Sequence, residues 1–270
     1  MKETLQSHKA WVSEVFDRAA PQYGEGAGAF FDYFGKRLVE QIPLRTRQHT
    51  LDIATGKGAV LFPLAEEVGP SGRVVGIDIS EQMIVETTAI ARKKGLEWIE
   101  LLQMDAEKLE FSDHSFDCVF CGFALFFFPS LEKALAEFKR VLKPGGTLAV
   151  TTWGEDSFLD AIVHAEIGLL THAPSLIVNP IWSLQSLQEA LNKAGFKNIC
   201  IREETKEFIH SSFNVWWNSL WTLATRAKLE NLSPEQLDTL QARLKAKILP
   251  LDKGEGIMEE LQVFYGIAEN

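Results

Sequence analysis

Three acidic residues stand at the ends of three short apolar segments. Asp52 lies in the segment Leu51–Gly58, Asp78 ends Val74–Asp78, and Asp105 follows Leu101–Met104. The acids recur about every 26 residues, which is roughly the length of one strand, one helix and two loops, so buried parallel strands would bring them to one sheet edge. A glycine turn after the first strand lets backbone approach a ligand, and the acid ending the second strand can accept two hydrogen bonds from a ribose diol. The pattern predicts a cofactor that contains a nucleoside.

The glycine loop indicates which nucleoside this is. A dinucleotide site needs Gly-x-Gly-x-x-Gly, but here only Gly56 and Gly58 are present and Leu61 takes the third position. A phosphate-binding Walker loop also needs a four-residue gap and a hydroxyl after the lysine, and this chain has neither. S-adenosylmethionine (SAM) fits better, because its ribose and adenine need acids and its methionine end needs close backbone amides and carbonyls. The alternative is a nicotinamide-dependent oxidoreductase, but the missing third glycine argues against it.

From about Val15 to Thr152 the chain resembles the class I SAM-dependent methyltransferases, and within them the ubiquinone and menaquinone biosynthesis C-methyltransferases. The matching stretches are Val15–Tyr23, Leu51–Gly58, Asp105–Glu107, Phe116–Cys118, Gly122–Leu125 and Arg140–Gly146. Gly24–Phe31 and Thr151–Trp153 depart from the pattern of the quinone enzymes.

The resemblance implies roles for individual residues. Asp78 would hold the ribose, Asp105 the adenine amino group, the Ala106 amide another adenine nitrogen, and Met83 the purine face. The full implied cofactor set is Tyr23, Asp52, Ala54, Thr55, Gly56, Lys57, Gly58, Asp78, Ile79, Met83, Asp105, Ala106, Gly122 and Phe123. Alternatively, each acid is only a solvated residue at the end of a strand. Lys57 either pairs with the cofactor carboxylate or points to solvent. In-line methyl transfer needs positioning, exclusion of water and, where the nucleophile is protonated, removal of a proton, and it needs neither a metal nor a nucleophilic side chain.

Aromatic residues gather where a methyl acceptor should lie. Phe123, Phe126, Phe127, Phe128, Trp153, Trp182, Trp216, Trp217 and Trp221 would suit a hydrophobic small molecule. The alternative is that Trp217, Leu220, Trp221 and Ala224, which have helical spacing, only attach a helical cap. His164 is the candidate base, with His8 and Tyr23 as further candidates, although a histidine at such a position is more often a surface or packing residue.

These residues require an α/β fold, which we expect to be a doubly wound, seven-stranded Rossmann-like sheet with helical lid insertions. We expect an N-terminal helical lid in residues 1–45, a SAM-binding core in 46–155, and the rest of the sheet with helical caps in 156–270, within one domain. Helices are expected at Ser7–Ala20, Ser157–Leu170, Phe213–Glu230 and Pro234–Leu249. Leu261–Ile267 should be an antiparallel strand at the end of the sheet.

Composition narrows the function further. Acidic residues outnumber basic ones, 37 to 27, so a nucleic acid is an unexpected partner. The longest apolar stretch, Cys118–Pro129, is too short to span a bilayer, and the first residues lack a signal-peptide core, so we expect a cytoplasmic protein. Cys118 and Cys121 form a C-x-x-C pair, but a three-residue offset within a strand sends them to opposite faces. The sequence does not indicate an oligomeric state. A SAM-binding sensor or partner protein without catalysis is the alternative function.

Overall fold

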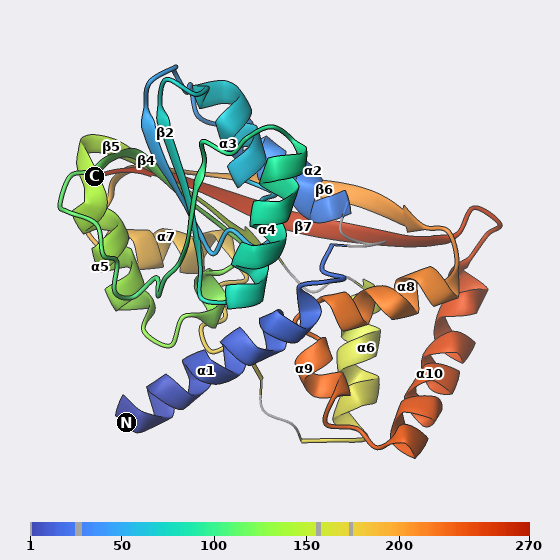
Figure 1. Cartoon of the computed structure of the whole chain (residues 1–270). Helices are drawn as coiled ribbons and strands as arrows, with labels where there is room; N and C mark the ends of the chain where they lie inside the picture. The colour runs from blue at the N-terminus through green and yellow to red at the C-terminus, as the bar shows by residue number, and fades with distance from the viewer. Residues whose placement is uncertain (1, 25–28, 155–157, 173–174) are drawn as a thin grey trace.

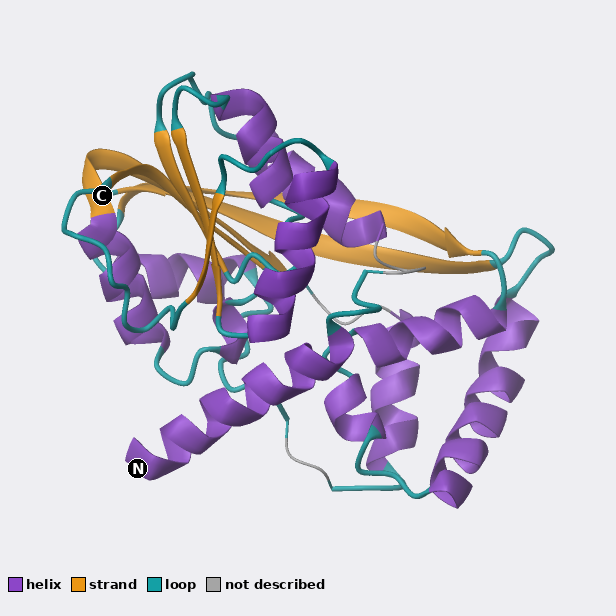
Figure 2. Ribbon diagram, in the orientation of Figure 1, coloured by secondary structure: helices purple, strands orange, loops and turns teal. Residues whose placement is uncertain are grey.

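The computed structural model describes residues 2–24, 29–154, 158–172 and 175–270, and within them it forms a seven-stranded sheet with helices on both faces (Figure 1; Figure 2). The strands are β1 (His49–Ile53), β2 (Arg73–Asp78), β3 (Glu100–Gln103), β4 (Phe116–Gly122), β5 (Leu142–Trp153), β6 (Lys197–His210) and β7 (Ile257–Glu269). Their order is β3-β2-β1-β4-β5-β7-β6. β1 to β5 pair in parallel, whereas β7 is antiparallel to both of its neighbours.

One expectation about the sheet is wrong. The last strand does not lie at the end of the sheet, because β7 pairs with β5 on one side and with β6 on the other, which leaves β6 at the edge. β7 is also longer than the expected Leu261–Ile267, since it starts at Ile257. The two long strands extend past the rest of the sheet toward the helical cap (Figure 1).

Apolar clusters explain how the helices cover the sheet. α2 (Ala29–Glu40) and α3 (Leu61–Val68) pack with the sheet in one cluster, with α4 (Glu81–Lys93) at its margin. α5 (Leu131–Val141) and α7 (Leu184–Lys193) pack on the other face. Cys118 belongs to the first cluster and Cys121 to the second, so the expected placement on opposite faces is confirmed. Burial raises the pKa of the Cys118 thiol to about 12, which keeps it in the unreactive protonated form.

A helical cap lies beside the protruding ends of the paired strands β6 and β7 (Figure 1). It consists of α6 (Phe158–Gly168), α8 (Phe213–Ser219), α9 (Arg226–Leu229) and α10 (Pro234–Ile248), and α6, α8 and α10 share an apolar cluster. The expected start of α6 at Ser157 lies outside the described residues. A capping box at Ser233 starts α10 as expected.

The single helix expected over Phe213–Glu230 is also wrong. α8 stops at Ser219, a short 3-10 turn covers Leu220–Thr222, and α9 follows. The hydroxyls of Ser219 and Thr222 each donate to a carbonyl three residues back, at 2.6 and 2.8 Å. Such local bonds offer the backbone an alternative to the α-helical pattern, and Leu223 then adopts an extended conformation.

α1 (Lys2–Ala19) begins five residues before the expected start and runs past the ends of the central strands (Figure 1). The Ser80 hydroxyl and the Gln82 amide both donate to its Asp17, at 2.6 and 3.1 Å. These bonds attach α1 to the first turn of α4. None of the described helices combines the length and the apolar character that crossing a bilayer requires.

Candidate functional site

The sheet has a switch point at its centre. β1 pairs with β2 on one side and with β4 on the other, so the connections that follow β1 and β4 diverge. Open α/β sheets bind ligands in the crevice that forms at the carboxyl ends of such strands. The loops after β1, β2, β3 and β4 therefore position the residues that the sequence analysis singled out.

Strained backbone marks the ends of both central strands. Ala54, directly after β1, and Phe123, directly after β4, have φ angles of 55° and 54°, which non-glycine residues rarely adopt. Gly56 and Gly58 also have positive φ, and a Cβ on Gly58 would lie 2.5 Å from the Phe62 ring. The conformation of the loop thus requires glycine at the second of these positions. The buried Thr87 hydroxyl donates to the Gly56 carbonyl at 2.6 Å and holds the loop in place.

Asp78 ends β2 beneath this loop. The Gly56 amide donates to one of its carboxylate oxygens and the Ser80 amide to the other, each at 2.9 Å. Burial raises the pKa of Asp78 to about 6, although the two amides oppose the shift because they favour the ionised form. Each oxygen therefore has one fixed backbone donor and further capacity to accept a ligand hydroxyl.

Asp52 is buried more deeply than a ligand-binding acid on the surface would be. It is 1% exposed, and its carboxylate accepts the Thr55 hydroxyl at 2.6 Å. Burial raises its pKa to about 7. The geometry makes Asp52 a support of the glycine loop, while a direct contact of Asp52 with the cofactor stays a prediction.

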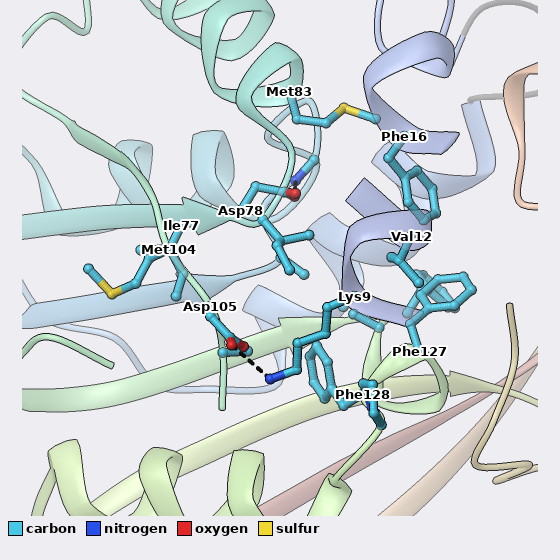
Figure 3. A pocket seen from close by; sticks show the side chains of 18 of the residues that line it. Lys9, Val12, Phe16, Ile77, Asp78, Met83, Met104, Asp105, Phe127 and Phe128 are labelled. Carbon is cyan, nitrogen blue, oxygen red and sulfur yellow. Dashed lines mark hydrogen bonds and ion pairs between the residues drawn. The ribbon is translucent and has the colours of Figure 1, made fainter. Parts of the chain in front are cut away.

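Asp105 lies next to a lysine that the sequence analysis missed. Lys9 of α1 contacts the carboxylate of Asp105 at 2.7 Å (Figure 3). It also contacts the carboxylate of Glu107 at 2.7 Å. Lys9, Val12 and Phe16 all line the same cavity as Asp78 and Asp105 (Figure 3). Their spacing of three and four residues places them on one helix face, which was the available signal.

Three adjoining cavities occupy this edge of the sheet. The acid-lined cavity is bordered by Asp78, Met83, Asp105 and Ala106, among others (Figure 3). The loop cavity is bordered by Asp52, Thr55, Lys57 and Gly58. Together these two cavities include all fourteen predicted cofactor residues, namely Tyr23, Asp52, Ala54, Thr55, Gly56, Lys57, Gly58, Asp78, Ile79, Met83, Asp105, Ala106, Gly122 and Phe123. The Lys57 amino group donates to the Pro21 carbonyl at 3.1 Å, and its pairing with the cofactor carboxylate stays a prediction.

The aromatic cavity is the third. Its aromatic walls are Phe16, Tyr23, Phe30, Phe31, Phe123, Phe126, Phe127, Trp153, Trp182 and Trp216. Tyr23 and Phe123 line all three cavities, so the cavities meet at these two residues. Phe123 stacks on Trp153 with ring centres 4.1 Å apart and an angle of 24° between the planes.

The remaining predicted acceptor residues divide between the cavities and the cap. His164 lines the aromatic cavity, together with Asp160 one helical turn earlier in α6. Phe128 lines the acid-lined cavity instead, and Trp217 and Trp221 pack in the apolar cluster of the cap. His8 contacts the edge of Trp11. Among the described residues no group of three or more histidine, cysteine or acidic side chains could hold a metal ion.

A family profile described as a methyltransferase domain matches residues 45–211, which is more than half of the chain. The chain belongs to this methyltransferase family. Its class I fold, its use of SAM and its classification as an enzyme are thereby confirmed, and the alternative of a sensor without catalysis gains no support.

Curated relatives include several small-molecule methyltransferases. Nocamycin O-methyltransferase of Saccharothrix syringae is 31% identical over 247 residues, covering 85% of this chain and 88% of that enzyme. Aklanonic acid methyltransferase of a Streptomyces species is 40% identical over 146 residues, covering 54% of this chain and 66% of that enzyme. Demethylmenaquinone methyltransferase of Lactobacillus johnsonii is 29% identical and covers 70% of this chain and 86% of that enzyme.

Solved structures share the fold at low sequence identity. The YcgJ protein of Bacillus subtilis has a TM-score of 0.62 and 20% identity, covering 88% of this chain and 98% of that chain. Phosphoethanolamine N-methyltransferase 2 of Haemonchus contortus, in complex with SAM, has a TM-score of 0.58 and 21% identity, covering 96% of this chain and 59% of that chain. The chemistry of the two cofactor cavities fits SAM, since an anchored carboxylate stands beside a close-packed glycine loop.

Proposed function

We propose that this methyltransferase methylates an oxygen atom of a hydrophobic, multi-ring aromatic small molecule. The observation that carries the proposal is the aromatic cavity, which meets both cofactor cavities at Tyr23 and Phe123. Ten aromatic side chains line the cavity and suit a flat, apolar ligand. The similarity to nocamycin O-methyltransferase along most of the chain supports oxygen as the acceptor atom.

We place SAM in the two cofactor cavities, with the residue roles that the family resemblance implies. Bound SAM supplies the reactive methyl group on its sulfonium. Asp78 would accept the two ribose hydroxyls, because both of its oxygens are already oriented by backbone amides. Asp105 and the Ala106 amide would bind the adenine, and Met83 would pack on its face. The loop residues Thr55, Gly56, Lys57 and Gly58, together with Gly122, would surround the methionine portion, and Ala54, Ile79 and Phe123 would complete the walls.

α1 would act as a lid over the adenine end. Lys9 shares its charge between Asp105 and Glu107, and the Ser130 amide donates to Glu107 at 2.7 Å. When the adenine amino group takes its place on Asp105, Lys9 would keep its ion pair with Glu107. The lid would therefore stay attached in the complex. The excess of acidic over basic residues, 37 to 27, further favours a small molecule over a nucleic acid as the acceptor.

His164 is the proposed general base. It lines the aromatic cavity, where a neutral imidazole could accept the proton that an acceptor hydroxyl loses as the oxygen attacks. The surrounding aromatic walls would exclude water from the reacting groups.

The test measures S-adenosylhomocysteine (SAH) formation with a panel of hydroxylated multi-ring aromatic compounds. His164→Asn should lower kcat by about 10²- to 10⁴-fold, the usual contribution of a positioned general base. SAM affinity measured by calorimetry should stay within twofold, since His164 does not line the cofactor cavities. His172→Asn, at an exposed histidine just after α6, is the matched control and should be fully active. An undiminished kcat in His164→Asn would exclude His164 as the general base. Absence of turnover by the wild type with every acceptor in the panel would refute the proposed function.

A further inference from the structure

A single charged residue interrupts the buried face of β7 beside the aromatic cavity. Ile257, Leu261 and Val263 alternate with outward-facing residues and are buried apolar side chains. Glu259 occupies the same face, is 7% exposed, and lines the aromatic cavity. An apolar residue would satisfy the packing at this position, so the carboxylate calls for a separate explanation.

His210 fixes this carboxylate from the neighbouring strand. Its Nε2 lies 2.8 Å from an oxygen of Glu259, and His210 is itself 4% exposed. A buried polar pair of this kind contributes little net stability, because removing both groups from water costs about as much as their attraction returns. A carboxylate that is buried and oriented at the wall of a ligand cavity is instead suited to recognising a polar group of the ligand.

The strand register places Glu259 far from the cofactor end of the cavity. Val263 pairs with Trp153, which stacks on Phe123 where the three cavities meet. Glu259 lies four residues further along β7, which at about 3.3 Å per residue corresponds to roughly 13 Å. The aromatic cavity thus has aromatic rings near the cofactor and a carboxylate toward the protruding end of β7.

We propose that Glu259 is a specificity-determining residue, positioned by His210, that binds a hydroxyl group of the acceptor at the end remote from the methylated oxygen. This inference rests on the proposed function, because it takes the aromatic cavity to be the acceptor site. It defines the acceptor as an elongated, linear multi-ring aromatic compound with polar groups at both ends. A carboxylate at the remote end of the acceptor is disfavoured, because Glu259 and Asp160 both line the cavity and would repel it. The histidines that face these acids are His164 and His210.

The experiment compares three ligands on the SAH-loaded protein. They are an anthraquinone with hydroxyl groups at opposite ends, the analogue lacking one hydroxyl, and the analogue with one hydroxyl replaced by a carboxylate. Quenching of tryptophan fluorescence reports binding without turnover, since Trp153, Trp182 and Trp216 line the cavity. The wild type should bind the dihydroxy compound about tenfold more tightly than each of the other two, as expected for a hydrogen bond to a carboxylate.

Glu259→Gln should weaken this selectivity. The advantage over the carboxylate analogue should disappear, and that analogue should bind the variant more tightly than it binds the wild type. Glu260→Gln is the matched control, because the next residue carries the same charge on the outward face. His210→Leu should reduce the preference for the second hydroxyl, whereas His210→Gln keeps a donor and should retain most of it. SAM affinity and thermal melting verify that each variant is folded.

Several outcomes would overturn the inference: equal binding of the three ligands by the wild type, binding of none, or a uniform loss for all three in Glu259→Gln. The last result would mark a purely structural role. Methyl transfer to the same compounds is measured separately. Selective binding without any SAH production would refute the proposed function and leave the recognition role standing, whereas turnover without selectivity would do the opposite.

Discussion

Replacing Asp78 by asparagine tests the cofactor site most directly. Both carboxylate oxygens accept a backbone amide at 2.9 Å, one from Gly56 and one from Ser80. Asparagine keeps one oxygen and presents an NH₂ group to the other amide, so one ribose hydroxyl loses its acceptor and the charge is removed. The loss should total about 1–3 kcal/mol. At about 1.4 kcal/mol per factor of ten, Kd should rise about 5- to 150-fold.

The same substitution should change the pH dependence of binding. Ribose hydroxyls donate to the ionised carboxylate, and burial raises the pKa of Asp78 to about 6 in the ligand-free protein. The wild-type affinity should therefore be constant above about pH 7 and fall as the pH drops below 6, because protonation of Asp78 then competes with binding. This dependence should be weaker in Asp78→Asn.

Calorimetric titration with SAM and SAH measures both effects, with NADH as a negative control. SAM and SAH share the ribose, so Asp78→Asn should weaken the binding of both ligands equally. A change at the methionine end need not affect the two ligands equally. Glu81→Gln removes a nearby exposed charge and should leave Kd unchanged. Equal affinity of Asp78→Asn and wild type for SAH at pH 7.5 would show that Asp78 does not bind the ribose.

Two further predictions concern the lid and the buried acids. Lys9→Met removes both ion pairs between α1 and the adenine end, so SAM should dissociate several-fold faster in stopped-flow measurements, and an unchanged rate would argue against a lid. The free energy of unfolding of the ligand-free protein, measured by urea titration, should decrease between about pH 5 and 8. The folded-state pKa values of Asp52 (about 7) and Asp78 (about 6) exceed the ordinary 3.8, so the folded state binds more protons than the unfolded state over this range. Asp52→Asn should reduce that slope, and a stability that rises over this range would contradict the reasoning.

Strands and cofactor residues could be predicted because both depend on local patterns. The apolar segment that ends at Asp78 was expected to be a buried strand and lies in β2, since a strand buried on both faces is a continuous apolar run. Parallel pairing then brings the strand ends to one edge without further information. The acids at those ends thus come together whatever the remainder of the chain does.

Errors arose where local side-chain bonds compete with a helical pattern and where distant segments decide the structure. The break after α8 depends on hydroxyl-to-carbonyl bonds that compete with a helical pattern, and the position of β7 depends on pairing with both β5 and β6. Lys9 was missed because its partner Asp105 lies 96 residues away in the sequence. The amphipathic spacing of α1 indicates a packed face but does not indicate which part of the sheet that face meets.

The two halves of the site therefore differ in how much the sequence reveals. Apart from Tyr23, the predicted cofactor residues all lie between Asp52 and Phe123, on successive strand–loop units whose geometry is set by a single parallel sheet. The aromatic cavity instead combines segments from Phe16 to Gln262, including α6 and β7. Glu259 is visible in the sequence only as an acid within an alternating strand, and the register with Trp153 is needed to place it in the cavity. We therefore expect changes in the cap and in β7 to alter the acceptor while the cofactor chemistry is kept, so ligand selectivity at Glu259 can be tested independently of SAM binding at Asp78.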